Sequence, residues 1–203
     1  MSDLTRADNF ELRRREVAQQ IFDAGGDDLL IVTGLGSPVW DFTAAGDCER
    51  IFHLWGAMGG AIPLGLGLAM AQPGKRVLVA TGDAEALMGV GSLATLAVQA
   101  PDNLAIAIFD NERYGETGMQ ATATAHKADL AAIAAGSGID RTATVKTQAE
   151  LDAAMPLMLS EPGPTVTVLK VRAESLPFIL PPKDGAYLKD RFRVALLGDD
   201  GIV

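Results

Sequence analysis

A carboxylate and a carboxamide stand at the ends of two apolar segments of this chain. Asp83 lies in the turn 82–84 after the run 76–81, and Asn111 follows the run 104–109. One strand-helix-strand unit separates them, so both side chains are expected at the carboxyl edge of a parallel sheet, where such sheets bind ligands. Mg²⁺ takes octahedral oxygen ligands, one or two from side chains and the others from water and phosphates. The pair therefore predicts a magnesium–diphosphate site.

The turn around Asp83 also suits an anion. Gly82 permits a tight turn, and residues 84–86 are expected to begin a helix whose free N–H groups favour a phosphate. Two simpler interpretations stay open on spacing alone. Asp83 could only cap the following helix, and Asn111 could only hydrogen-bond its own turn.

The elements that must position this pair are predicted from hydrophobic periodicity. Strands alternate with helices, which favours an α/β fold with a doubly wound, mostly parallel sheet and helices on both faces. We expect one domain over residues 1–175 and a tail, 176–203, whose prolines keep it out of the sheet, so that it runs over the surface or onto a partner. The predicted strands are 29–32, 76–81, 104–109 and 165–171, and the predicted helices are 9–24, 58–71, 87–100, 127–135 and 149–159.

Composition narrows the class of protein. The chain has 203 residues, 48% hydrophobic and 21% charged, which is enough for a full core, and its net charge of −9 disfavours nucleic acid and anionic membranes. Cys48 is the only cysteine, so no internal disulfide can form. The polar residues 1–6 do not resemble a signal peptide, and the apolar stretch 62–71 is too short to span a bilayer. A soluble, cytoplasmic enzyme subunit is expected.

Three segments carry a family resemblance. Residues 82–97 and 103–120 resemble the diphosphate-binding domain of thiamine-diphosphate-dependent decarboxylases, above all the small (beta) subunit of sulfopyruvate decarboxylase and the C-terminal half of phosphonopyruvate decarboxylase. The glycine-rich segment 55–67 is similar to the Met-Gly segment of acetolactate synthases. The resemblance runs from about residue 33 to 138. It implies a thiamine-diphosphate-binding fold, a lyase activity, and thiamine diphosphate and Mg²⁺ as cofactors.

The resemblance also implies a set of site residues. The metal ligands would be the side chains of Asp83 and Asn111 and the main-chain carbonyl of Arg113. Met58 would lie under the cofactor and hold its two rings in a bent V, although filling of the core is an equal alternative. The full set of expected cofactor contacts is Gly36, Ser37, Met58, Gly82, Asp83, Ala84, Glu85, Asn111, Tyr114, Gly115, Glu116 and Thr117.

Two of these residues depart from the family pattern. Ala84 replaces a usual glycine, which is tolerable if its φ is negative, and the Glu85 carboxylate would repel phosphates unless it turns away. His53 is the one candidate for a catalytic contact, with a structural histidine as the alternative. Cys48 lies between two acidic residues, which raise a thiol pKa, so it is not expected to be a nucleophile.

The implied function is decarboxylation of a small 2-oxo acid. A chain of this length has room for one of the two α/β domains of such enzymes, so a separate pyrimidine-binding subunit would supply the catalytic glutamate, in an α2β2 or larger assembly. The resemblance suggests a sulfonate or phosphonate substrate, with Arg113, Lys127 and Arg50 as candidate cations. An acetolactate-type carboligase subunit and a non-catalytic homologue that has lost its cofactor remain alternatives. Nicotinamide binding is disfavoured, because the segment 34–36 lacks the third glycine of that fingerprint.

Overall fold

A six-stranded parallel sheet forms the centre of the protein in the computed structural model, which describes residues 4–202. The expectations for residues 1–3 and 203 lie outside this range. The strand order is β2-β1-β3-β4-β8-β7, and all five strand pairs are parallel. The predicted α/β fold is thereby confirmed. The strands are β1 (Leu29–Thr33), β2 (Ile51–His53), β3 (Arg76–Gly82), β4 (Leu104–Asp110), β7 (Arg141–Val145) and β8 (Thr165–Lys170).

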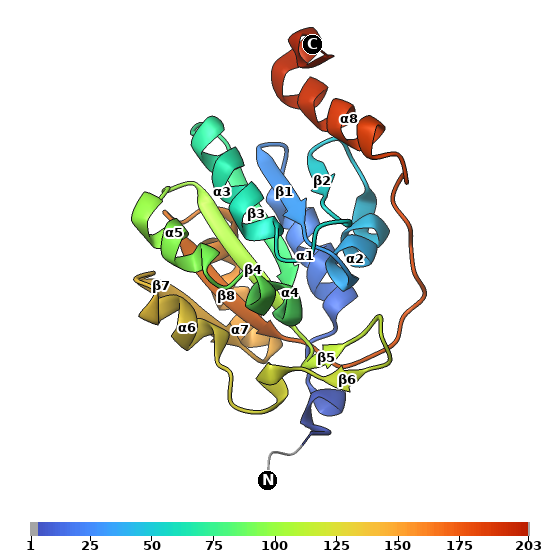
Figure 1. Ribbon diagram of the computed structural model, residues 1–203, viewed down its shortest axis with the longest axis vertical. Helices are drawn as coiled ribbons and strands as arrows, with labels where there is room; N and C mark the ends of the chain where they lie inside the picture. The colour runs from blue at the N-terminus through green and yellow to red at the C-terminus, as the bar shows by residue number, and fades with distance from the viewer. Residues whose placement is uncertain (1–3, 203) are drawn as a thin grey trace.

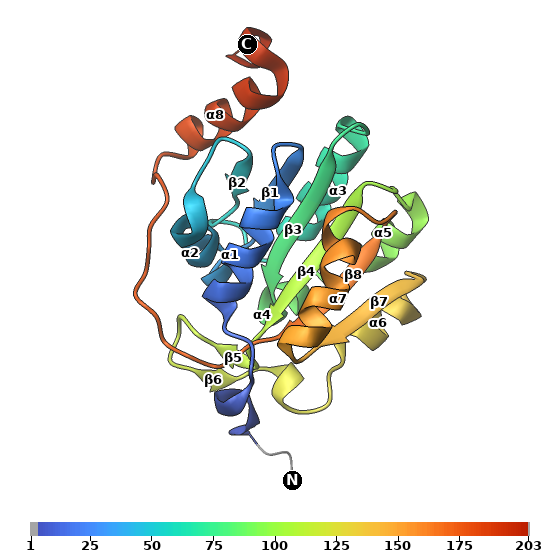
Figure 2. The same ribbon diagram turned by 180° about the vertical axis from the view of Figure 1, so that it is seen from behind.

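Helices cover both faces of this sheet, giving three layers. Figures 1 and 2 show the molecule from its two sides, with α3, α5 and α6 on one face and α1 and α7 on the other. A short hairpin of β5 (Arg113–Tyr114) and β6 (Gln120–Ala121) follows β4. The helices of the domain are α1 (Arg14–Gly25), α2 (Ser37–Gly46), α3 (Ala61–Ala71), α4 (Asp83–Met88), α5 (Ser92–Gln99), α6 (Leu130–Gly136) and α7 (Gln148–Leu159), with 3-10 turns η1 (Arg6–Asn9) and η2 (Ala123–Ala125).

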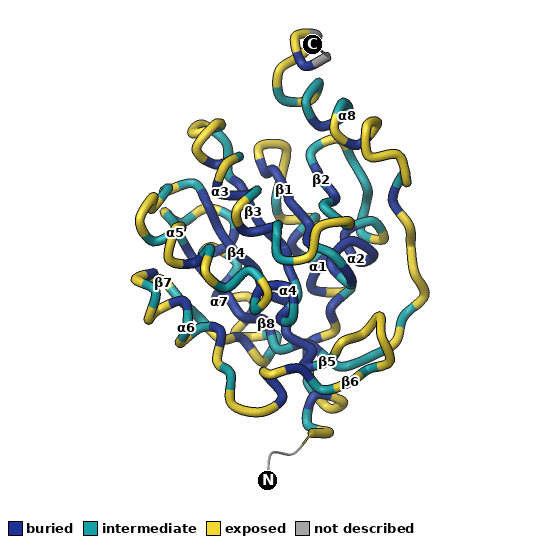
Figure 3. Tube along the Cα trace, in the orientation of Figure 1, coloured by how far each residue is buried: buried dark blue, intermediate teal, exposed yellow. Residues whose placement is uncertain are grey.

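The central strands β1, β3, β4 and β8 are buried on both faces, as Figure 3 shows in dark blue for the middle of the sheet. Side chains of β4 alternate between two hydrophobic clusters: Ile106 and Ile108 face α3, α5 and α6, whereas Ala105 and Ala107 face α1, α2 and α7. Burial on both faces explains why the central strands read as continuous apolar runs, which is the pattern that made them predictable.

The direction in which the chain adds strands to the sheet reverses after β2, so β3 lies on the other side of β1. The chain steps from β1 outward to β2, then returns to the other side of β1 and continues through β3 to β4. This reversal opens a crevice at the carboxyl ends of β1 and β3, which is the usual ligand position in an open α/β sheet.

Several predicted helix boundaries were wrong. The single helix expected over 87–100 is two helices, because α4 begins at Asp83 and a turn containing Gly89 and Gly91 separates it from α5. The helix expected from residue 58 begins at Ala61, since Gly59 has a left-handed φ of 85°. The first helix begins at Arg14, five residues later than expected.

Further elements were not predicted: α2, β2, the β5–β6 hairpin, β7, the turns η1 and η2 and, in the tail, α8 (Gly185–Leu197) followed by η3 (Gly198–Ile202). Figure 1 shows the segment after β8 running along the side of the molecule to α8, which lies beside β2. There Phe192 packs on Phe52 and Arg191 pairs with Asp47. None of the helices in residues 4–202 has the length and apolar character needed to cross a membrane.

Candidate functional site

A cavity of about 240 Å³ opens at the carboxyl ends of β1, β3 and β4. Every residue that the sequence proposed for cofactor or metal binding lines this cavity. The structure thus brings together segments that lie far apart in the chain. Their roles in binding remain predictions. The predicted residues in the lining are Gly36, Ser37, Met58, Gly82, Asp83, Ala84, Glu85, Asn111, Arg113, Tyr114, Gly115, Glu116 and Thr117.

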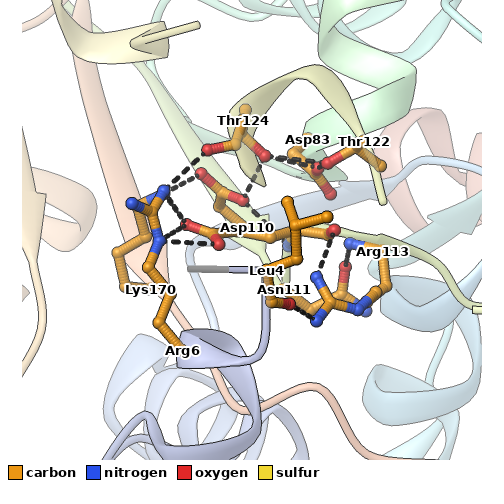
Figure 4. Close-up of polar contacts among 10 residues, drawn as sticks. Leu4, Arg6, Asp83, Asp110, Asn111, Arg113, Thr122, Thr124 and Lys170 are labelled. Atoms are coloured by element: carbon orange, nitrogen blue, oxygen red, sulfur yellow. Dashed lines mark hydrogen bonds and ion pairs between the residues drawn. The ribbon is translucent and has the colours of Figure 1, made fainter. Parts of the chain in front are cut away.

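Asp83 is the first residue of α4, directly after β3, and only 2% of it is exposed. Its Oδ2 atom accepts hydrogen bonds from the hydroxyls of Thr122, at 2.5 Å, and Thr124, at 2.9 Å (Figure 4). Burial and the neighbouring carboxylate of Asp110 raise the pKa of Asp83, and the two threonine hydrogen bonds oppose this rise. A cation beside Asp83 would relieve this crowding of negative charge.

Asn111 directly follows β4 and is 7% exposed. Its side-chain oxygen accepts a hydrogen bond from the main-chain N–H of Arg113 at 2.9 Å. The turn between them depends on Glu112, which has a left-handed φ of 59°. The guanidinium of Arg113 donates to the carbonyl oxygens of Leu4 and Glu112, so this side chain reaches the N-terminal segment (Figure 4).

Glu85 lines the cavity, and its side chain is buried with the carboxylate against Thr81 and Gly34. Oε2 accepts a hydrogen bond from Thr81 at 2.5 Å, and the backbone of residues 35, 59 and 61 also lies against the carboxylate. Burial raises the pKa of Glu85, and Thr81 together with the backbone of residue 35 and the 59–61 segment opposes the rise. The carboxylate lies against Gly34, where a larger residue would not fit. The hydrogen bond from Thr81 and the neighbouring backbone N–H groups offset part of the repulsion of a phosphate that was expected from Glu85.

The β5–β6 hairpin crosses one side of the cavity. Gly115 lies near Asn111 and Ser37, since a side chain added at Gly115 would be 3.9 Å from each. Glu116 is held by a 2.8 Å hydrogen bond from the indole N–H of Trp40 in α2. This contact fixes the hairpin against the helix that begins at Ser37.

Met58 lies at the edge of the cavity and is 39% exposed. An exposed methionine does not fill the core, so the packing alternative for Met58 loses its physical basis.

Arg14 is a lining residue that the sequence did not indicate. It is 4% exposed, and its guanidinium donates to Asp41 in α2, while Arg15 donates to the same carboxylate at 3.1 Å. Burial raises the pKa of Asp41 and the two arginines oppose the rise. Two guanidinium groups share at most one negative charge here, so the cluster carries excess positive charge beside the cavity.

His53 lies outside this lining and its side chain is fully buried. Its Nδ1 atom is 2.9 Å from the Thr33 hydroxyl and its Nε2 atom is 3.1 Å from Asp47. Because a carboxylate only accepts, Nε2–H donates to Asp47, and Nδ1 shares a hydrogen bond with the Thr33 hydroxyl. The structure connects His53 to the docking of α8, because Asp47 also accepts from Arg191.

The two other candidate cations also lie away from the cavity. Lys127 lines a second cavity, of about 360 Å³, on the other side of Asp110, together with His126 and Lys170. Arg50 precedes β2, so it lies at the amino end of the strands, away from the cavity at their carboxyl ends, and it pairs with Asp27.

Four polar residues behind Asp83 were missed by the sequence analysis: Thr122, Thr124, Asp110 and Lys170 (Figure 4). Thr124 contacts Asp110 at 2.8 Å, and Lys170 donates to Asp110 at 2.6 Å. The signal that could have found the threonines was the alternation Thr122-Ala-Thr124 after the glycine-rich hairpin. No spacing rule connects that segment to Asp83.

The donor set fits Mg²⁺ and a diphosphate. Asp83 and Asn111 offer hard oxygen ligands directly after the adjacent strands β3 and β4, and the described residues contain no group of three His, Cys, Asp or Glu side chains that could hold a metal ion. Such a set leaves most positions of an octahedral ion to phosphates and water, as Mg²⁺ requires. Ala84 lies within α4 and has helical backbone, so the alanine is accommodated.

Comparisons with known proteins agree with this chemistry. Residues 39–169 match the family described as thiamine pyrophosphate enzyme, C-terminal TPP binding domain. The chain is 35% identical over 158 residues to sulfopyruvate decarboxylase subunit beta of Methanocaldococcus jannaschii, covering 78% of this chain and 83% of that one. It is 37% identical over 153 residues to phosphonopyruvate decarboxylase of Streptomyces hygroscopicus, covering 75% of this chain but 38% of that longer protein.

A solved structure shares the fold. The X-ray structure of a putative thiamin diphosphate-dependent enzyme from Mycobacterium smegmatis superposes with a TM-score of 0.69 at 23% identity. The match covers 80% of this chain and 32% of that chain.

Proposed function

The chain belongs to the thiamine pyrophosphate enzymes, through their C-terminal TPP-binding domain, and we propose that it is the diphosphate- and Mg²⁺-binding subunit of a thiamine-diphosphate-dependent 2-oxo acid decarboxylase. Thiamine diphosphate and Mg²⁺ are the cofactors of this family. The observation that carries the proposal is the convergence of Asp83 and Asn111, with the predicted contact residues, on one cavity at the reversal of strand order.

Individual residues have distinct roles in the proposal. Asp83, Asn111 and the main-chain carbonyl of Arg113 hold Mg²⁺, which binds the diphosphate. Gly36, Ser37 and the 114–117 segment surround the diphosphate, and Met58 supports the rings of the cofactor. When bound, the cofactor supplies a nucleophilic carbon and an electron sink that allows a 2-oxo acid to lose CO₂. The contribution of this chain is to anchor and orient the cofactor.

The charges around the cavity support an anionic ligand. Arg14 and Arg15 share the single carboxylate of Asp41, and Arg14 lines the cavity. Glu85 keeps its carboxylate against Thr81 and Gly34, and Glu116 is held by Trp40. Arg14 and Arg113 are the cations of the lining, and Mg²⁺ at Asp83 would add positive charge, which favours a diphosphate over a neutral ligand.

The second part of the proposal concerns the substrate and the partner. Relatives named sulfopyruvate and phosphonopyruvate decarboxylase support a 2-oxo acid that carries a sulfonate or phosphonate group. The name "subunit beta" supports a separate partner subunit, which in our proposal provides the pyrimidine-binding domain and the catalytic glutamate in an α2β2 or larger assembly. Residues 1–175 form the cofactor-binding domain of this scheme. The exposed Phe178, Ile179 and Leu180 support a partner contact for the tail.

Two experiments test the proposed function. Calorimetric titration of the purified chain with thiamine diphosphate should give Mg²⁺-dependent binding, and no heat of binding in a chelator. Decarboxylation of sulfopyruvate and phosphonopyruvate should then require the partner subunit. A single chain that decarboxylates as fast as the reconstituted pair would contradict the divided active site. Absence of cofactor binding to the pair would favour a non-catalytic homologue.

A cytoplasmic location remains a prediction from the sequence.

A further inference from the structure

We propose that Thr122 and Thr124 are positioning residues for Asp83: their hydroxyls hold one carboxylate oxygen and leave the other for Mg²⁺. The inference rests on the proposed function, because it takes Asp83 as the metal ligand. Neither threonine belongs to the turns that contain Asp83 and Asn111.

Both hydroxyls contact the same oxygen of Asp83. The Thr122 hydroxyl lies 2.5 Å from Oδ2 and the Thr124 hydroxyl lies 2.9 Å from it. All three residues are buried, with 1% to 2% of each exposed. Among the described side chains none donates a hydrogen bond to Oδ1, and the further contact of the carboxylate is with the backbone N–H of Asp83 itself. The carboxylate thus has one oxygen engaged by the protein and one that can coordinate a cation.

The main chain fixes the position of the threonines. Thr122 follows β6, and its N–H donates to the carbonyl oxygen of Glu112 at 3.1 Å. Glu112 comes directly after Asn111, so one backbone hydrogen bond connects the threonine segment to the segment of the second proposed ligand. The two hydroxyls are also 2.9 Å from each other, which limits their rotation.

Thr124 also contacts a second carboxylate, that of Asp110. The Thr124 hydroxyl lies 2.8 Å from Oδ1 of Asp110, whose Oδ2 accepts from Lys170 at 2.6 Å (Figure 4). Lys170 also donates to Glu112 at 2.9 Å. Thr124 therefore lies between two carboxylates and donates its single hydroxyl proton to one of them at a time, whereas Thr122 donates to Asp83 alone.

The physical reason for such support is the geometry of the ion. The last torsion of an aspartate is soft, whereas Mg²⁺ demands near-ideal octahedral angles at 2.0–2.1 Å. Outer hydrogen bonds fix the orientation of a ligand, and their removal typically costs about 10- to 100-fold in metal affinity.

Another buried threonine provides a matched comparison. Thr167 in β8 is fully buried, and its hydroxyl has no hydrogen-bond partner among the described residues. Burial alone therefore does not give a threonine hydroxyl of this protein a hydrogen-bond partner. Thr167→Val makes the same chemical change as Thr122→Val or Thr124→Val but removes no contact with Asp83.

The test measures metal affinity and requires no turnover. Mg²⁺ is titrated calorimetrically into the full chain with saturating thiamine diphosphate, and Mn²⁺ binding is followed by paramagnetic resonance. We expect Thr122→Val and Thr124→Val each to weaken binding about 10- to 100-fold. Thr122→Ser and Thr124→Ser, which keep the hydroxyl, should stay within about 3-fold of the original chain, and Thr167→Val should be unchanged. Thermal unfolding in chelator checks that each variant folds.

The outcomes separate the two proposals. If the original chain binds the metal and both valine variants bind it equally well, the positioning role is wrong and the proposed function stands. If the serine variants lose as much affinity as the valine variants, packing of the methyl region is responsible and the positioning role is also wrong. If neither the folded original chain nor its pair with the partner subunit binds metal or cofactor, both proposals fall. Should a valine variant not fold, the corresponding alanine variant carries the same test.

Discussion

The carboxylate of Glu85 occupies the space that a side chain on Gly34 would need. A Cβ atom at Gly34 would overlap the carboxylate carbon and both carboxylate oxygens of Glu85. Gly34 directly follows β1 and Glu85 lies in α4, which begins after β3, so this contact joins the two strand ends that frame the crevice. Thr81 donates a hydrogen bond to Oε2 of the same carboxylate. The glycine at this position is therefore explained by close packing with a buried acid.

Gly34→Ala should consequently destabilise the chain by about 1 to 3 kcal/mol, the usual cost of overpacking. Urea denaturation measures the change. Gly74→Ala is the control, because a Cβ there has no neighbour within 4 Å, and we expect no destabilisation. In the double variant Gly34→Ala/Glu85→Ala, the second change vacates the space, so the combined effect should be smaller than the sum by at least about 0.5 kcal/mol. Strict additivity would show that Glu85 is not the obstacle.

Asp83→Asn should reduce Mg²⁺-dependent binding of thiamine diphosphate by about 100-fold or more, since loss of a direct ligand should cost at least as much as loss of an outer hydrogen bond. Calorimetry at several Mg²⁺ concentrations measures the effect. Asp129→Asn removes the same charge at the beginning of α6, where the side chain caps the helix and asparagine caps equally well, so cofactor binding should not change. Equal affinities of the Asp83 variant and the original chain would remove Asp83 from the metal site.

The pH dependence of stability should contain a contribution from Asp47. Burial raises the pKa of this carboxyl, but hydrogen bonds and charge from His53 and Arg191 outweigh burial and hold its pKa below the ordinary 3.8. The folded state therefore binds fewer protons than the unfolded state. The stabilisation is complete above the ordinary pKa and is lost as the pH falls below 3.8 toward the lowered value.

Asp47→Asn should cost about 1 to 3 kcal/mol at pH 7, as for hydrogen bonds to a charged group, and the difference from the original chain should shrink below about pH 4. Urea denaturation between pH 3 and 7 measures it. Asp190→Asn is the control, because Asp190 pairs on the surface with its neighbour Lys189. Its effect should stay within about 0.5 kcal/mol at every pH. A constant difference between Asp47→Asn and the original chain would contradict the linkage.

The sequence predicts the parts of this protein whose signal is local. The β3 and β4 strands are continuous apolar runs, so their ends, and with them Asp83 and Asn111, could be placed on one sheet edge. In contrast, β7 was missed because it is a largely exposed edge strand with the polar sequence Arg-Thr-Ala-Thr-Val. The helix over 87–100 was predicted as one because glycine in a helical pattern does not by itself indicate a break.

Contacts formed by distant segments were outside the reach of sequence patterns. Thr122 and Thr124 meet Asp83 only because the β5–β6 hairpin returns to the end of β4, which is a tertiary event. Arg14 enters the cavity lining because α1 packs on α2, where Asp41 accepts its hydrogen bond. His53 could be placed near the sheet edge, but its partner Asp47 and the docking of α8 could not be foreseen.

Two glycines of α3 should respond in opposite ways to the same substitution. A Cβ at Gly65 would overlap Cγ2 of Val79 in β3, whereas a Cβ at Gly67 would have no neighbour within 4 Å. Gly65→Ala must therefore push the helix off the sheet and should destabilise the chain by about 1 to 3 kcal/mol. Gly67→Ala lowers the backbone entropy of the unfolded chain at an exposed helical position and adds no clash, so it should stabilise the chain by about 0.5 to 1 kcal/mol. Urea denaturation of both variants measures the contrast, and stabilisation by Gly65→Ala would show that α3 does not need its close approach to β3.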